Sequence, residues 1–116
     1  MPVTNEVRNH LLSTLEYVGE VSDDLALATT PDDAANALRP LGGVLDDEID
    51  WFRAHVPSGT GGPVGAYGTD IATTRAAVAA IESAGSAPTA DLVAKARAQV
   101  AALLALRPDL EALPSS

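Results

Sequence analysis

The chain has 116 residues, of which 47% are hydrophobic and 20% charged, and it contains no cysteine. This composition is typical of one small folded domain, and it excludes disulfides, thiol catalysis and cysteine-ligated zinc or iron–sulfur sites. No apolar run approaches the roughly 20 residues that a membrane span needs, and the first ten residues lack the apolar stretch of a signal peptide. We therefore expect a cytoplasmic protein that does not enter membranes.

Charge is distributed unevenly along the chain. The net charge is −9, and residues 1–56 hold eleven acidic and three basic side chains, whereas residues 57–116 hold five and four. Such a surface repels phosphate backbones and has no run of lysine and arginine with which to release counterions, so we expect no binding to nucleic acid. An acidic first half favours a basic partner, although acidity is also an ordinary route to solubility.

The first predicted helix is capped by Thr4 and carries one apolar stripe for about six turns. Its apolar positions, spaced by three or four residues, are Val7, Leu11, Leu15, Val18, Val21 and Leu25. Thr30 can cap a second helix with Pro31 at its first position. The two helices therefore form a tight hairpin.

Pro40 and the pair Gly42-Gly43 predict a kink or a short break in the second helical stretch, because proline removes a backbone donor and glycine weakens a helix. The apolar stripe nevertheless continues until Pro57 ends the helix. Its members are Leu38, Leu41, Leu45, Ile49, Phe52 and Val56.

Residues 57–68, PSGTGGPVGAYG, contain five glycines and two prolines and predict one long connection without regular structure. Thr69 or Asp70 then begins a third helix, which ends near Gly85. Thr89 begins a fourth helix, which Pro108 ends.

These segments predict an all-α protein, a four-helix bundle made of two helical hairpins. The whole chain, 1–116, forms a single domain. It consists of a long acidic hairpin (4–56), a linker (57–68), an alanine-rich hairpin (69–107) and a short tail (108–116).

Familiar catalytic and nucleotide-binding motifs are not found in the sequence. The segment Gly59–Val64 begins like a dinucleotide fingerprint, but valine stands at the third glycine position and no strand precedes it. No basic residue lies between Thr60 and Asp70 to serve a phosphate loop, and the G-x-S-x-G elbow of serine hydrolases does not occur. We expect no cofactor.

The two histidines lie on similar flanks of the first two apolar stripes, as a helical wheel of 100° per residue shows. Since the hairpin closes near residues 29 and 30, both rings approach the same end of the bundle. The candidates for catalysis are the four titratable residues Glu6, His10, Glu48 and His55. The candidates for ligand binding are the aromatic residues Tyr17, Trp51 and Tyr67.

The same residues have a plain alternative interpretation, as polar and aromatic side chains that border the core of amphipathic helices. Neither histidine has a glutamate three residues before it, as ferritin-like di-metal bundles require, so we expect no metal site. Trp51 lies about 120° from the core line of its helix, so either another helix or a partner should cover it.

Two functions from different classes remain open. The first is a non-enzymatic interaction module that binds a protein partner, or a second copy of itself, through the hairpin of residues 1–56. The second is a small enzyme or ligand-binding protein with a pocket between the first two helical stretches near His10 and His55, gated by the glycine-rich loop. The directions of Glu6, His10, Glu48 and His55 distinguish them, because a pocket needs all four to converge on one cavity.

Overall fold

The structure, a computed structural model, describes residues 4–85 and 90–113. Helices account for 84% of this part of the chain, which contains no strand. The helices are α1 (Asn5–Leu27), α2 (Pro31–Leu38), α3 (Leu41–His55), α4 (Gly62–Ala84), α5 (Ala90–Leu104) and α6 (Arg107–Glu111). The predicted all-α class is confirmed, and the arrangement is consistent with a four-helix bundle in which α2 and α3 together take the second place.

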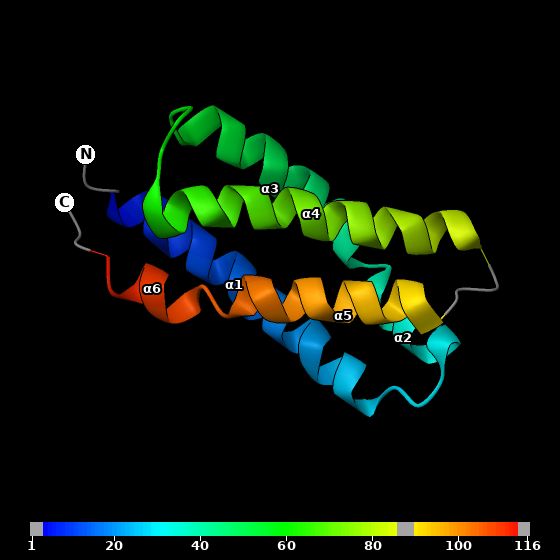
Figure 1. The fold of residues 1–116 in the computed structure, drawn as a ribbon. Helices are drawn as coiled ribbons and strands as arrows, with labels where there is room; N and C mark the ends of the chain where they lie inside the picture. Colours follow the sequence, from blue (N-terminus) through cyan, green and yellow to red (C-terminus); the bar gives the residue numbers. More distant parts are fainter. Residues whose placement is uncertain (1–3, 86–89, 114–116) are drawn as a thin grey trace.

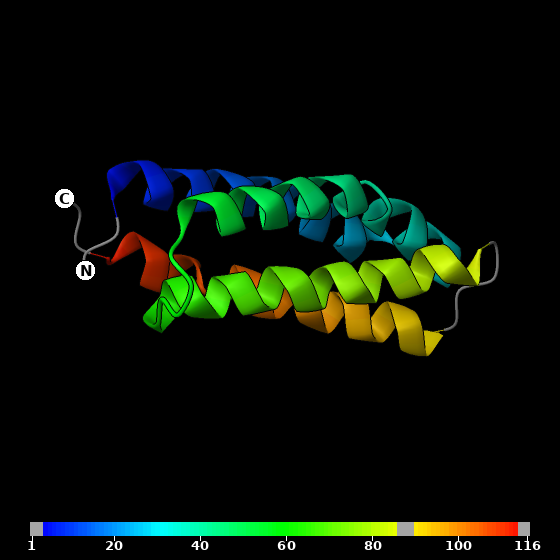
Figure 2. The same cartoon turned by 90° about the horizontal axis from the view of Figure 1, so that it is seen from above.

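The bundle is elongated, with extents of 46 × 23 × 18 Å, and has two layers. Figure 2 shows α1 and α3 in one layer and α4 and α5 in the other, while Figure 1 shows that the two layers cross obliquely. The short helix α6 lies beside the beginning of α1, and α2 lies at the opposite end of the bundle (Figure 1). None of the helices in the described ranges is long and apolar enough to cross a membrane.

The beginnings of α1 and α2 confirm the predicted caps. The hydroxyl of Thr4 accepts a hydrogen bond from the backbone N–H of Val7 at 3.2 Å, and the hydroxyl of Thr30 accepts one from Asp33 at 3.1 Å. Each cap satisfies an N–H group that has no partner inside its own helix. The predicted break at Pro40 is also present, because α2 ends at Leu38 and α3 begins at Leu41.

The predicted irregular linker over 57–68 is present only in residues 57–61, and its second half is helical. The connection ends at Gly61, and α4 begins at Gly62, so the third long helix starts seven residues before Thr69. Pro63 in the first turn favours this start, since its missing N–H would be unpaired there anyway. Gly68 lies inside the helix, and Phe52 of α3 packs directly on it, so a Cβ atom there would lie 2.5 Å from the phenyl ring.

The predicted end of the chain also requires correction. The helix α5 ends at Leu104, and Pro108 lies in the first turn of α6, so it does not end the fourth helix. Of the predicted tail, residues 108–113 are described, and they pack on the bundle, because Leu110 is fully buried where α6 packs against α1 and α4. The predicted cap at Thr89 lies outside the described residues.

The core is formed by most of the two predicted apolar stripes together with residues of α4, α5 and α6, whereas Val7, Ile49 and Phe52 of those stripes are only partly buried. Apolar residues of α1 from Leu11 to Leu25 are buried at the predicted spacing. Although α1 and α3 belong to the same predicted hairpin, α3 packs mainly against α4, whereas α1 packs about equally against α5, α2 and α6. Contacts with the second half of the chain therefore add to the direct contacts within the acidic hairpin.

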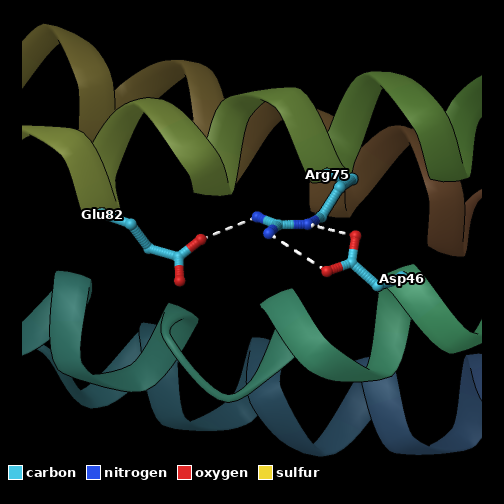
Figure 3. A network of polar contacts seen from close by, with 3 residues as sticks. All are labelled: Asp46, Arg75 and Glu82. Carbon is cyan, nitrogen blue, oxygen red and sulfur yellow. Dashed lines mark hydrogen bonds and ion pairs between the residues drawn. The ribbon is translucent and has the colours of Figure 1, made fainter.

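A polar clamp joins the two layers at α3 and α4. Arg75 of α4 donates two hydrogen bonds to the carboxylate of Asp46 on α3, at 2.7 and 3.2 Å, and a third to Glu82 at 2.7 Å (Figure 3). The hydrogen bond from Arg75 holds the pKa of Asp46 below its usual range. Gly42 faces this clamp, because a Cβ atom at that position would lie 3.3 Å from the carboxylate of Glu82.

Candidate functional site

A buried carboxylate lies between α1, α3 and α4. Glu48 is only 3% exposed, although it sits on the flank of α3 where a partly exposed side chain was expected. Its Oε1 atom lies 2.5 Å from Nε2 of His10 on α1, and its Oε2 atom accepts a hydrogen bond from the hydroxyl of Tyr67 on α4. A carboxylate removed from water needs such partners, and both oxygens of Glu48 have one.

Tyr67 is fully buried, and its environment favours the neutral phenol. Burial raises the pKa of the Tyr67 hydroxyl well above its ordinary value, and the negative charge and the hydrogen bond of Glu48 raise it further. A hydrogen bond with the side chain of Thr14 on α1 acts in the opposite direction and is the smallest of these effects. Tyr67 therefore serves as a permanent hydrogen-bond donor to Glu48 in the folded protein.

Trp51 lies between the two histidines. The ring of His10 stacks on the indole with the centroids 3.5 Å apart and the planes within 5°, and the ring of His55 stacks at 4.3 Å and within 13°. Two imidazoles at these distances would overlap if they shared one face of the indole, so they cover opposite faces. Nδ1 of His55 also lies 2.9 Å from the backbone carbonyl oxygen of Trp51, which fixes this ring against its own helix.

Helical spacing explains how these side chains meet. Glu48, Trp51 and His55 follow each other at steps of three and four residues, so they occupy one face of α3. His10 and Thr14 are four residues apart and share one face of α1, and this spacing is the signal by which Thr14 could have been found in the sequence. Thr14 was not among the predicted candidates.

The structure brings together five of the seven predicted site residues and leaves two apart. The polar and stacking contacts join His10, Glu48, Trp51, His55 and Tyr67. Glu6 is exposed one turn before His10 and takes no part in those contacts. Tyr17 lies two turns beyond His10 and packs, partly buried, against the apolar core. The cluster therefore uses three helices, whereas the sequence pointed to two.

A cavity on the same pair of helices, α3 and α4, is lined by other residues. It has a volume of about 530 Å³ and lies between the end of α3, the loop of residues 57–60 and the first turns of α4, with Phe52 and Gly68 in its wall. None of the four predicted catalytic residues lines it. Glu6, His10, Glu48 and His55 therefore do not converge on this space, as an enzyme pocket would require.

The same residues do not form a metal centre. No group of three or more His, Asp or Glu side chains converges within residues 4–85 and 90–113 in a way that could hold an ion. His10 and Glu48 supply only two ligand groups between them, and these are directed at each other. Comparison of the chain with known protein families, characterised proteins and solved structures found no match.

Proposed function

We propose that the protein is a non-enzymatic interaction module that binds a basic segment of a partner protein through the outward side of α1. We call this side the acidic face, and it consists of Glu16, Glu20, Asp23 and Asp24. All four side chains are exposed, and steps of three and four residues place them next to each other. Leu27, which is 80% exposed, extends the same side of the helix by one turn.

The observation that carries the proposal is that five of the six arginines bind groups outside the acidic face. Three of them donate hydrogen bonds to backbone carbonyl oxygens: Arg8 to Leu113, Arg39 to Gly85 and Arg97 to Leu25. Arg75 pairs with Asp46 of α3 and with Glu82 of its own helix, and Arg107 pairs with Glu111 within α6. None of the ion pairs in the described ranges includes a residue of the acidic face. This charge is therefore available to an external cation.

The same charge favours a basic partner over a second copy of the chain. Two acidic faces repel each other, and so do an acidic face and a phosphate backbone. Trp51 contributes less to the proposal than the sequence suggested, because His10 and His55 already cover both faces of its ring. The pocket alternative has less support, since both oxygens of Glu48 are bonded within the protein.

The test is binding of a synthetic lysine-rich peptide, measured by fluorescence anisotropy at several salt concentrations. We expect binding that weakens steeply above about 0.1 M salt, where the screening length falls to about 10 Å. Neutralising the acidic face with E16Q, E20Q, D23N and D24N should weaken binding by about tenfold, because four surface charge contacts contribute a few tenths of a kcal/mol each.

A matched control removes the same amount of charge from other surfaces. The variant with D47N, D50N, D91N and D109N also changes four exposed acids, which lie on α3, α5 and α6. It should bind the peptide almost as well as the original protein does. An equal loss in both variants would show that only net charge matters, and the absence of peptide binding at low salt would reject the proposal outright.

A further inference from the structure

His10 makes the direct polar contact between α1 and α3. Among the described residues, its contact with Glu48 is the hydrogen bond or ion pair that joins side chains of these two helices. Its ring also stacks on Trp51 of α3. Since α1 and α3 each pack more extensively against other helices than against each other, these two contacts of His10 form an important part of the seam between them. We call this seam the α1–α3 seam.

The strength of the contact depends on one proton. When the imidazole of His10 is charged, it forms an ion pair with a carboxylate that is almost fully buried, and it presents a cation to the face of the indole. When the imidazole is neutral, Glu48 retains only neutral hydrogen-bond donors for a charge that has been removed from water. A buried charge without a counter-charge is costly, so the neutral form weakens the contact.

We propose that protonation of His10 controls how closely the α1–α3 seam is closed. The seam is tight when His10 is charged, and it loosens at pH values at which His10 is neutral. Histidine is suited to this role because an ordinary imidazole changes charge between pH 5 and 8, and His10 is 35% exposed, so protons reach it from the solvent.

The other ionisable groups around His10 have defined positions. On α3 they are Glu48 and His55, and His55 lies on the far side of the indole. On α4 the phenol of Tyr67 faces Glu48 and remains neutral. On α1 Glu6 is one turn away and exposed, and on α6 Arg107 pairs with Glu111 at 3.3 Å. Glu48 is therefore the charged group in direct polar contact with His10.

Trp51 provides the measurement, since it is the one tryptophan of the chain. Quenching of its fluorescence by acrylamide reports how much of the indole is open to small molecules. We expect the quenching constant to rise by about twofold between about pH 5 and about pH 8, because one of the two covered ring faces becomes accessible. Far-UV circular dichroism at each pH should show that the helices remain folded.

Two matched substitutions identify the residue that is responsible. H10Q retains an amide donor for Glu48 but cannot gain a charge, so it should abolish the pH dependence of quenching. H55Q removes the other stacked imidazole and leaves the contact with Glu48, so the pH dependence should persist. Quenching of the unsubstituted protein that does not change with pH would overturn the proposal, and so would a pH dependence lost in H55Q but kept in H10Q. If H10Q does not fold, the unsubstituted protein and H55Q still decide the outcome.

Discussion

Tyr67 is the neutral donor on which the buried carboxylate of Glu48 depends. We expect Y67F to lower the free energy of unfolding by about 1–3 kcal/mol, because it leaves one oxygen of a desolvated charge without its hydrogen bond. Urea denaturation measures this change. Y17F is the control, since Tyr17 is only partly buried at the edge of the core, and it should change stability by less than about 0.5 kcal/mol. If Y67F and Y17F lowered the free energy of unfolding equally, the hydrogen bond from Tyr67 to Glu48 would not be a specific source of stability.

The raised pKa of Tyr67 also predicts how stability varies in alkali. In the unfolded chain a tyrosine loses its proton near pH 10, whereas the folded protein keeps the proton on Tyr67. The folded state then binds more protons than the unfolded state, so stability falls as the pH rises above about 10. Urea denaturation at about pH 9 and about pH 11 should show this fall. The loss of stability between these two pH values should be smaller in Y67F. An equal loss in Y67F would show that groups other than Tyr67 cause it.

At the scale of the helix, the contact between α3 and α4 depends on a glycine. We expect G68A to destabilise the protein by about 1–3 kcal/mol, because the new methyl group would collide with the ring of Phe52. Gly43 in α3 is the control, since a Cβ atom there meets nothing within 4 Å. G43A should be neutral or stabilise by up to about 1 kcal/mol, because alanine favours the helix. Thermal unfolding of both variants tests this difference, and the same sign of change in both would contradict it.

The helix α6 is a structural part of the bundle. We expect L110A to cost about 2–5 kcal/mol, the range for truncating a fully buried leucine. L27A, at a leucine that is 80% exposed, should cost less than about 0.5 kcal/mol. Chemical denaturation compares the two variants. A loss for L110A as small as that for L27A would mean that residues from Arg107 onward do not pack as described.

At the scale of the whole molecule, helix content is the property that most directly tests the architecture. Helices make up 84% of the described residues, and those ranges contain no strand. Far-UV circular dichroism at neutral pH should therefore show a strongly helical spectrum without a measurable sheet contribution. A substantial strand signal would contradict both the predicted class and the structure.

The whole structure also determines which charged side chains have partners inside the protein. The arginines that join distant segments are held by carbonyl groups or by acids such as Asp46, and they leave the acidic face of α1 without internal partners. The α1–α3 seam lies on another side of the same helix. The two proposals therefore concern two sides of α1, an outward acidic face and an inward contact between His10 and Glu48.

The sequence by itself determined the helical class, the caps at Thr4 and Thr30, the break at Pro40 and the buried face of the first helix. These features are local, because they depend on residues within a turn or two of each other and on the 3.6-residue period. The sequence also placed His10 and His55 at the same end of the bundle. Periodicity shows which side of a helix faces inward, but it does not show which atoms meet there.

The tertiary structure alone decided the features that depend on distant partners. Glycines in 57–68 predicted a loop from local propensity, yet residues 62–68 are helical, and Gly68 leaves the space that Phe52 of another helix occupies. Glu48 was expected on a polar flank, yet it is buried because α1 and α4 supply His10, 38 residues away, and Tyr67, 19 residues away. A residue's burial and charge state follow from the groups that packing brings to it, and those groups are specified only when all helices are in place.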